Sequence, residues 1–495
     1  MRTFPTLGRR RFLAALTATG AATLLAACGG AASPTAAPAA TVAPKPTSAA
    51  AATSAPAATS PPAATSAPAA TISAPTTPAA GATGAAGVAS PAAAATTSPG
   101  AAAPTPAAKP AAGGNFAGSI LFGAPISLTG STAKEGGLTR EGYDIWKDVY
   151  NEAGGIKVGG KSYRIDTKYY DDESNAQKTA TLADKLIKED KVNLLLGPYG
   201  TSGTLQMSTV AEKAKIPMIE GNGAAESIFS QGYKYTFGVL SPAPNYLRGV
   251  IDMALAQNPK PATIAILSAD DPFSVEVADA TRKYAESKGL QVVYYQKYPN
   301  ASTDLRAPVT EAKAKNPDLF LNSGHLQESV AIMQQAKELG FNAKGFAFSV
   351  GPSIPDFQTS LKDAANYVFG GTQWTEVMKW NGDDLFKTPE NYYNQYKAKF
   401  GHEPSYQSAE STACGVAYVK AIEAAGSFDP QPVRDAIAKL DFMSFYGPIK
   451  FDERGVNTFK PMAVEQWQNG KKVTVWPPDA ANGKPIWPTP EWGKR

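Results

Sequence analysis

The chain has 495 residues, and residues 29–114 contain 37 Ala, 15 Pro, 13 Thr, 8 Ser and 8 Gly, with no aromatic and no acidic residue. Such a segment cannot bury enough apolar surface to offset the ordering of its backbone, so we predict a flexible tether. Residues 115–495 carry 41 basic and 43 acidic residues, a net charge of −2, although the whole chain has a net charge of +4. This balance removes the electrostatic reason to expect a nucleic acid as a partner.

Cysteine and histidine are too rare for the usual metal and disulfide frameworks. The chain contains two cysteines, Cys28 and Cys414, and two histidines, His325 and His402. We therefore predict no metal site and no disulfide framework, and no cofactor, because no cofactor motif stands in the right context. No apolar run of 18 residues follows residue 115, so we expect that this part does not span a membrane.

The N-terminal segment has the pattern of an export signal. Residues 8–28 combine a basic start, a short apolar stretch and small residues before a cysteine, which resembles a bacterial lipoprotein signal peptide with the lipobox LAAC. We predict that residues 1–27 are removed, that Cys28 is lipidated, and that residues 28–114 tether the protein to the membrane. The stretch RRRFL at residues 9–13 is also similar to the twin-arginine signal. Plain basic signal regions are common as well, so both export routes stay open.

From residue 119 onward, short β-rich runs alternate with helical stretches, a pattern typical of parallel sheets in an α/β fold. We predict a first series with strands at 119–125, 163–170, 193–197 and 217–220 and helices at 135–153, 174–189 and 203–214. A second series has strands at 262–268, 290–296, 318–323 and 345–349 and helices near 272–288, 304–315 and 326–339. Two lobes are expected, each with its ligand-binding side at the carboxyl ends of the strands.

After residue 370 the alternation loosens. Helices are predicted at 389–400, 408–425 and 430–439, followed by a strand at 446–452 and further strand-like runs to Trp476. The tail, residues 477–495, is rich in proline and tryptophan, and we expect it to pack on a surface of the protein.

One stretch matches a nucleotide-binding motif in the wrong context. Residues 155–162, GIKVGGKS, agree with the phosphate-loop pattern letter for letter. A working phosphate loop leaves a strand and opens a helix, whereas here a predicted helix precedes the motif and a strand follows it. We interpret Gly154 and Gly155 as the end of the helix and Gly159 and Gly160 as the turn into the strand.

Several residues of types that occur in catalytic sites are interpreted as having structural roles. Ser202 lies in the stretch GTSG, which is not the nucleophile elbow, and neither His325 nor His402 is placed as its partner. The carboxylates at residues 171–173 are interpreted as a solvated strand end and a helix cap. Cys414 is expected to be buried in its helix. We therefore predict that the protein is not an enzyme.

The loops after the predicted strands have the composition of a binding site. They are rich in glycine, hydroxyl and amide groups and comprise residues 127–130, 197–203, 220–223, 270–273, 324–325 and 349–351. Tyr199, Phe273 and Trp374 are candidate apolar walls. No general base or metal site is evident among these loops.

The chain resembles the leucine/isoleucine/valine-type solute-binding proteins of ABC importers. The likeness covers nearly all of residues 118–476 and includes the stretches PISLTGSTAKEGGLTREGYDIWKDVYNEAGGI, YYDDESN, LLLGPYGTSG, IPMIEGNG, YGPIKFDERGVNTF and QWQNGKKVTVWP. It implies a type I periplasmic binding fold, with two Rossmann-like α/β lobes that have parallel sheets and close on a ligand.

The same resemblance implies three crossovers between the lobes, which we place near residues 238, 368 and 447. Lobe 1 then comprises residues 115–238 and 369–446, lobe 2 comprises residues 239–368 and 447–476, and residues 477–495 form a C-terminal tail.

Carried over by position, the resemblance implies roles for several loop residues. The hydroxyl that meets a ligand's carboxylate falls on Thr201, with backbone N–H groups near residues 222–224. Three positions depart from the family's pattern. Ala224 stands where the branched-chain binders have a second hydroxyl, and Ser349 lies near the position of the carboxylate that holds the ligand's ammonium. Phe273 is the aromatic residue from the second lobe, where tyrosine is typical.

A buried ammonium without an acid partner is costly. These departures therefore leave two readings of the ligand open. It is either an amino acid, with Glu220 or Glu328 as the ammonium partner, or a carboxylate or amide.

The predicted ligand-contacting residues are Ser127, Tyr199, Gly200, Thr201, Ser202, Asn222, Gly223, Ala224, Phe273, Ser349 and Trp374. We predict a monomeric, lipid-anchored protein outside the cytoplasmic membrane that delivers a small organic solute to an ABC permease. Two alternatives are a sensory module that acts through a separate receptor and, with less support, an exported enzyme.

Overall fold

The computed structural model describes residues 115–495. The predicted signal peptide, Cys28 and the tether lie outside the described residues. Among residues 115–495, no helix is both long enough and apolar enough to cross a membrane.

The first sheet has six strands in the order β2-β3-β1-β4-β5-β6. Neighbouring strands are parallel except β2 and β3, which form an antiparallel hairpin. The three residues of β4, all leucine, are buried, as expected for a sheet that is covered on both faces. The strands are β1 (Gly118–Ile126), β2 (Ile156–Val158), β3 (Lys161–Asp171), β4 (Leu194–Leu196), β5 (Met218–Glu220) and β6 (Thr236–Gly238).

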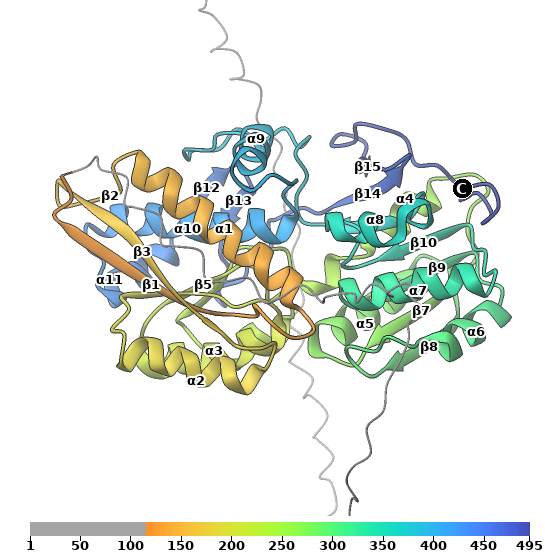
Figure 1. Cartoon of the computed structure of the whole chain (residues 1–495), viewed down its shortest axis with the longest axis horizontal. Coiled ribbons are helices and arrows are strands. Elements are labelled where there is room, and N and C mark those ends of the chain that lie inside the picture. Colours follow the sequence, from red (N-terminus) through yellow and green to blue (C-terminus); the bar gives the residue numbers. More distant parts are fainter. Residues whose placement is uncertain (1–114) are drawn as a thin grey trace, which may run out of the picture. The chain divides into compact units, whose positions relative to one another are not determined.

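Helices cover both faces of this sheet, and we call the sheet with its helices lobe 1. Figure 1 shows α2 (Ala176–Lys188) and α3 (Thr201–Ala214) on one face and α1 (Ala133–Glu152) and α10 (Tyr406–Ala425) on the other. α1 and α10 approach closely because Gly415 has no side chain, and a Cβ there would lie 2.1 Å from the Trp146 ring. The remaining elements are α9 (Pro389–Phe400), α11 (Pro430–Ile437), the 3-10 helix η1 (Glu226–Gln231), and β12 (Asp441–Ser444) with β13 (Gly447–Lys450), which form a separate two-stranded sheet.

The second sheet has seven strands in the order β15-β14-β11-β10-β9-β7-β8. β14 and β15 are antiparallel to their neighbours and the others are parallel. The strands are β7 (Thr263–Ala269), β8 (Gln291–Tyr298), β9 (Leu319–Ser323), β10 (Gly345–Phe348), β11 (Phe369–Thr372), β14 (Ala463–Gln468) and β15 (Lys471–Trp476).

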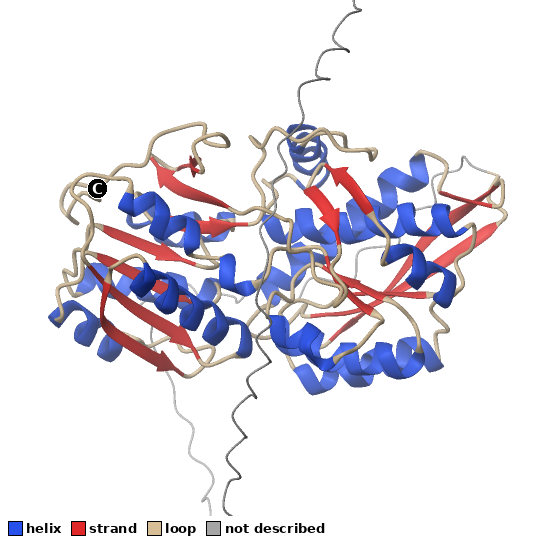
Figure 2. Cartoon of the chain, turned by 180° about the vertical axis from the view of Figure 1, so that it is seen from behind, coloured by secondary structure: helices blue, strands red, loops and turns tan. Residues whose placement is uncertain are grey.

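We call this second sheet with its helices lobe 2, and Figure 2 shows helices on both sides of its strands. The helices are α4 (Arg248–Leu255), α5 (Pro272–Ser287), α6 (Arg306–Ala314), α7 (Leu326–Glu338) and α8 (Pro355–Leu361), with the 3-10 helices η2 (Ala243–Asn245) and η3 (Lys362–Ala365).

The predicted strands and helices are present with small shifts at their ends, but two boundaries between lobes differ. β11 pairs with β10 and β14, so residues 369–372, which we assigned to lobe 1, belong to the second sheet. β13, which we assigned to lobe 2, pairs only with β12. The sequence FGGT of β11 has too little β propensity to show which sheet it joins, and its partners are distant in the chain.

The stretch GIKVGGKS forms a hairpin. β2 ends at Val158, β3 begins at Lys161, and Gly159 and Gly160 between them have φ of 55° and 78°, as a two-residue hairpin turn requires. Gly155 follows the end of α1 with φ of 74°, and its N–H donates to the carbonyl of Tyr150 at 2.8 Å. The structural interpretation of this stretch is confirmed.

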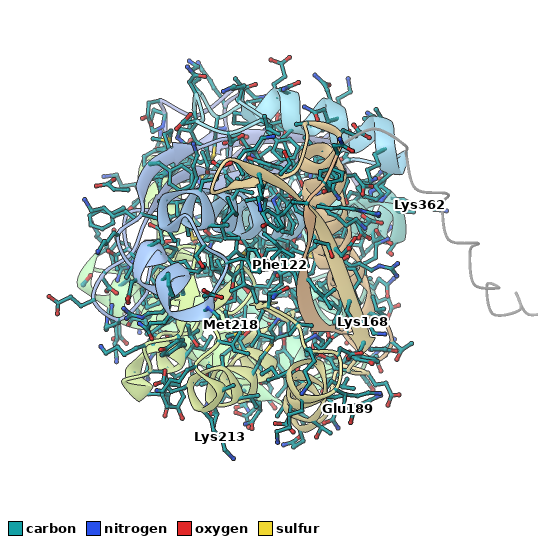
Figure 3. The ribbon with its side chains drawn as sticks, turned by 90° about the vertical axis from the view of Figure 1, so that its left-hand side faces the viewer. Phe122, Lys168, Glu189, Lys213, Met218 and Lys362 are labelled. Atoms are coloured by element: carbon teal, nitrogen blue, oxygen red, sulfur yellow. The ribbon has the colours of Figure 1, made fainter. Side chains whose placement is uncertain are left out.

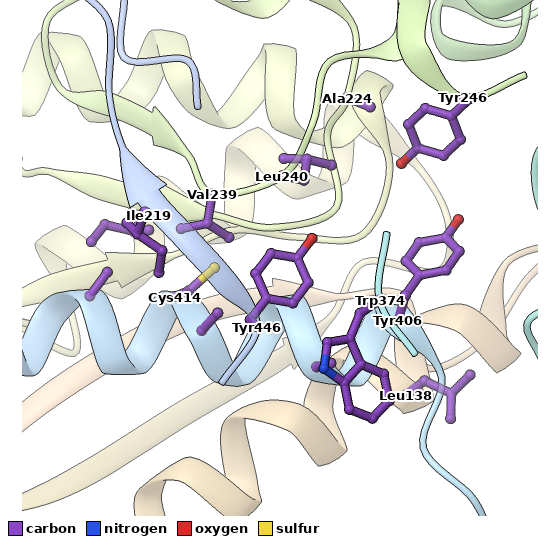
Figure 4. Packing of buried hydrophobic residues seen from close by; sticks show 14 of the residues in the cluster. Leu138, Ile219, Ala224, Val239, Leu240, Tyr246, Trp374, Tyr406, Cys414 and Tyr446 are labelled. Carbon is purple, nitrogen blue, oxygen red and sulfur yellow. The ribbon is translucent and has the colours of Figure 1, made fainter. Parts of the chain in front are cut away.

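The core of lobe 1 lies between the sheet and its helices. Phe122 and Met218 are fully buried, whereas Lys168, Glu189 and Lys213 are exposed at the periphery (Figure 3). Cys414 is also fully buried, and Figure 4 shows it near Ile219, Val239 and Tyr446. The expectation of a buried Cys414 is confirmed.

The tail packs on lobe 2, as predicted. The indole Nε1 of Trp487 donates to the carbonyl of Pro259 at 2.9 Å, and the indole Nε1 of Trp492 donates to the carbonyl of Phe341 at 2.6 Å. The side chain of Gln466, on β14, makes two hydrogen bonds with the backbone of Ile486, at 2.8 and 3.0 Å. The tail therefore covers the ends of elements that are far apart in the sequence.

Candidate functional site

Two adjoining cavities lie where loops of both lobes meet. The inner cavity has a volume of about 10 Å³ and is lined by Tyr199, Gly200, Asn222, Tyr246, Phe273, His325, Val350, Tyr406 and Glu410. The outer cavity has a volume of about 180 Å³, and its lining is rich in hydroxyl groups, among them those of Ser127, Thr132, Thr201 and Ser202. Tyr199, Gly200 and His325 line both. The inner cavity has room for about one water molecule.

The N-terminus of α3 forms one side of the outer cavity. Gly200 precedes the helix with φ of 81°, a conformation that favours glycine, and its carbonyl accepts a hydrogen bond from the N–H of Thr204 at 3.1 Å. The N–H groups of residues 201–203 have no acceptor among the described residues, as is usual in a first helical turn. Together with the helix dipole they favour an anion at this position.

Two hydroxyl residues at the outer cavity are held by buried partners. Thr201 Oγ1 accepts a hydrogen bond from the N–H of Ala225 at 3.3 Å, which joins the loops after β4 and β5. Ser127 Oγ donates to Asp172 at 2.7 Å. Both residues are thereby positioned by side-chain contacts to neighbouring loops.

Asp172 corrects the prediction of a solvated carboxylate cluster. Its side chain is 1% exposed, and it accepts hydrogen bonds from Ser127 and Thr179. Burial raises the pKa of this carboxyl above its ordinary value, although the two hydroxyls oppose the shift. The helix cap of α2 is Asn175 rather than an acid.

His325 contributes a positive charge from lobe 2. Its Nδ1 lies 3.1 Å from the hydroxyl of Tyr199, in lobe 1, and its Nε2 lies 3.4 Å from Asp271. Burial alone would lower the pKa of His325, but the nearby carboxylates Asp271, Glu328 and Glu135 raise it to about 9. The imidazole is therefore protonated at neutral pH. Sequence reasoning placed His325 in a strand-end loop but did not include it among the ligand contacts.

Aromatic rings form the walls of the inner cavity. The ring centroids of Tyr246 and Phe273 are 5.0 Å apart, and those of Tyr246 and Tyr406 are 6.4 Å apart. Figure 4 shows the rings of Tyr246 and Tyr406 facing each other. Tyr199 and Phe273 were predicted as walls, whereas Tyr246 and Tyr406 were missed. These two tyrosines lie outside the strand-end loops, after η2 and at the start of α10, so no local pattern marks them.

Some predicted contacts do not line either cavity. The indole of Trp374 donates to the carbonyl of Phe445 at 3.3 Å, so Trp374 is part of the core. The hydroxyl of Ser349 accepts a hydrogen bond from the N–H of Gly324 at 3.3 Å, and Gly223 donates its N–H to Glu220. Ala224 is buried in the core cluster. The predicted residues that do line the cavities are Ser127, Tyr199, Gly200, Thr201, Ser202, Asn222 and Phe273.

The loop that carries Ser127 depends on a close approach to α1. A Cβ added to Gly136 would lie 1.9 Å from the carbonyl oxygen of Ser127, whereas one added to Gly137 would meet nothing within 4 Å. We expect Gly136→Ala to lower the free energy of unfolding by about 1–3 kcal/mol, because the loop must move. Gly137→Ala is the matched control and is expected to raise it by up to about 1 kcal/mol through helix propensity. Urea denaturation of both variants measures the difference, and equal effects would contradict the contact.

Two α/β lobes with a polar cavity between them define a hinged, two-lobed binding protein. The family model described as Periplasmic binding protein matches residues 119–472, which is more than half of the chain, and the chain belongs to this family. Its members are solute-binding proteins of transporters rather than enzymes.

Similar proteins agree with this assignment. Leu/Ile/Val-binding protein homolog 8 of Brucella abortus is 28% identical over an alignment 380 positions long, which covers 74% of this chain and 92% of that protein. The crystal structure of the leucine binding protein LivK of Thermotoga maritima has a TM-score of 0.64 and 22% identity, and covers 73% of this chain and 99% of that chain. A solute binding protein of R. palustris in complex with benzoate has a TM-score of 0.62 and 18% identity, and covers 73% and 96% of the two chains. The predicted α/β fold of the type I periplasmic binding proteins is confirmed.

Proposed function

We propose that this solute-binding protein captures a small organic carboxylate, amino acids included, and delivers it to an ABC permease. One observation carries the proposal. The N-terminus of α3 in lobe 1 and the protonated His325 in lobe 2 line the same cavity, so a carboxylate is attracted from both sides. The relatives named as Leu/Ile/Val-binding and the neighbour with bound benzoate support a ligand of this class.

The proposed mechanism is closure of the two lobes on the ligand. The carboxylate accepts hydrogen bonds from the N–H groups of residues 201–203 in lobe 1 and is attracted by the charge of His325 in lobe 2, whose ring nitrogens contact Tyr199 and Asp271, and so bridges the lobes. The structure already contains contacts between lobes, because the N–H of Leu326 donates to Glu135 at 3.1 Å and the N–H of Glu226 donates to Glu276 at 2.7 Å. A ligand of amino-acid size does not fit the inner cavity of about 10 Å³, so the lobes must part to admit it. Binding then shifts the open-to-closed equilibrium toward the closed form, and the permease recognises that form.

The place of action belongs to the same proposal. Cys28 carries the lipid anchor and residues 28–114 form the tether, so that the monomeric protein works at the outer face of the cytoplasmic membrane. The LAAC sequence before Cys28 supports this part of the proposal, and export by either the general or the twin-arginine route is compatible with it.

The ligand class is tested by a thermal-shift panel of amino acids, aromatic acids, aliphatic acids and amides on protein stripped of ligand by unfolding and refolding. A ligand at 100 times its Kd that binds only the folded state adds about 2.7 kcal/mol of stability. We expect stabilisation by carboxylates. Stabilisation by amides alone, or by no member of the panel, would contradict the proposal.

We expect Thr201→Ala and Phe273→Ala each to weaken binding of the best carboxylate about tenfold, because one loses a hydroxyl at the ligand and the other an apolar wall. Isothermal titration calorimetry measures the Kd. The control is Thr209→Ala, which alters an exposed hydroxyl on the same helix α3 and is expected to leave the Kd unchanged. An unchanged Kd in both test variants would show that the ligand binds elsewhere.

A further inference from the structure

The inner cavity contains an amide oxygen without a donor. Asn222 Nδ2 donates to Ser411 Oγ at 2.9 Å, and Ser411 Oγ in turn donates to the carbonyl of Gln407 at 2.7 Å. Because the only proton of this hydroxyl is used, the amide of Asn222 must direct its NH₂ toward Ser411. Its Oδ1 is then a buried acceptor with no hydrogen-bond partner among residues 115–495.

Glu410 supplies a buried carboxyl group in the same cavity. This residue of α10 is 1% exposed, and its Oε2 accepts a hydrogen bond from the hydroxyl of Tyr446 at 3.0 Å. Its Oε1 receives no hydrogen bond from any described residue. A buried acceptor without a donor is costly, so Asn222 favours a ligand that brings a donor, and the carboxyl of Glu410 lies in the lining of the same cavity.

The other acids considered as ammonium partners lie outside the lining of both cavities. Glu220 Oε2 accepts hydrogen bonds from the N–H groups of Asn222 and Gly223, at 2.9 and 2.6 Å, and its Oε1 has no partner among the described residues but lines neither cavity. Glu328 uses one oxygen for the N–H of Ala301 and the other for the N–H of His325. Neither Glu220 nor Glu328 is therefore placed to meet an ammonium group in these cavities.

The two adjoining cavities therefore have two kinds of polar lining. His325, which lines both, and the first turn of α3, which lines the outer cavity, offer a positive charge and donors. Asn222 and Glu410, which line the inner cavity, offer oxygen atoms. A carboxylate alone satisfies only the first set. A protonated amine donates hydrogen bonds to Asn222 Oδ1 and favours the ionised form of Glu410.

We propose that Asn222 and Glu410 form a second recognition point, which selects carboxylates that also carry a protonated amine. This inference rests on the proposed function, because it assumes that a carboxylate binds between the lobes. It assigns the choice of ligand to α10 and to the loop after β5, instead of to the position of Ser349.

Proton release offers an independent readout. Burial raises the pKa of Glu410 well above its ordinary value, and a neighbouring ammonium opposes that shift, so binding an amine releases a proton. The titratable groups around Glu410 are Glu220, Lys460, Tyr199, Tyr246, Tyr406, Tyr446 and Cys414. Burial lowers the pKa of Lys460 to about 7, so wild type and Glu410→Gln must be compared in the same buffers.

The test uses the full protein and isothermal titration calorimetry with matched ligand pairs. Each pair shares one skeleton with and without the amine: leucine with 4-methylpentanoate, and 4-(aminomethyl)benzoate with 4-methylbenzoate. We expect wild type to bind one amine at least tenfold more tightly than its partner, and Glu410→Gln to remove most of that preference with less than a twofold change for the partner. The binding enthalpy of the amine is expected to depend on the buffer's ionisation enthalpy in wild type and not in Glu410→Gln.

Two further variants keep the test decisive. Asn222→Ala removes the unpartnered amide oxygen and is expected to reduce the amine preference about threefold. This variant tests the inference independently if Glu410→Gln does not fold. Glu423→Gln changes an exposed acid on the same helix and is expected to change nothing. Equal affinities within each pair, equal losses for both members in Glu410→Gln, or a preference for 4-hydroxybenzoate over the amine would overturn the inference. The proposed function fails separately, if no carboxylate of either kind binds.

Discussion

Replacement of His325 by glutamine is expected to weaken binding of the carboxylate ligand about 100-fold, since truncating one partner of a buried charge pair costs several kcal/mol. The imidazolium contacts Tyr199 of lobe 1 and Asp271 of lobe 2. Glutamine removes the positive charge and leaves the carboxylates of Asp271, Glu135 and Glu328 uncompensated beside the ligand. His402→Gln, at the other histidine of the chain, is the control and is expected to leave the Kd unchanged.

The same histidine predicts a pH dependence. The pKa of His325 is raised from its ordinary value of 6.5 to about 9 in the folded protein. Its contribution to stability is therefore fully present below pH 6.5 and is lost as the pH rises through about 9. The affinity for a carboxylate without an amine follows the same protonated form, so its Kd is expected to be constant up to about pH 8 and to rise above about pH 9. Calorimetric titration across this range measures it, and an identical pH profile in His325→Gln would rule out the assigned role.

Removal of residues 477–495 is expected to lower the free energy of unfolding by about 4 kcal/mol, since two tryptophans lose part of their buried area. Trp487 and Trp492 each donate a hydrogen bond to the backbone of lobe 2, and Gln466 loses both bonds to Ile486. The guanidinium of Arg495 lies 3.7 Å from the ring centroid of Trp492, and this contact is lost as well.

Guanidinium denaturation followed by circular dichroism measures this effect. A shorter truncation that removes residues 493–495 keeps both tryptophans and is expected to cost much less. If the long and short truncations unfolded at the same denaturant concentration, the tail would not contribute to the stability of lobe 2.

The sequence predicted most of the secondary structure because the signals for it are local. The leucines of β4 and the glycines of the hairpin at Gly159 and Gly160 are typical of a buried strand and a tight turn wherever they occur. The strand-end loops were also predicted, because parallel strands place their carboxyl ends at one edge of a sheet. Ser127, Thr201 and Phe273 were found in this way.

The sequence by itself determined the α/β alternation, the loops that line the cavities and the family resemblance. Only the tertiary structure decided which side chains meet, because these contacts join residues far apart in the chain. Tyr199 meets His325 across 126 positions, and Asn222 meets Ser411 across 189. Trp374 was predicted as a wall and lies in the core, whereas Glu410, in a helix that is buried on nearly all sides, lines the inner cavity. Burial and charge at such positions depend on packing between lobes and helices, which no local pattern records.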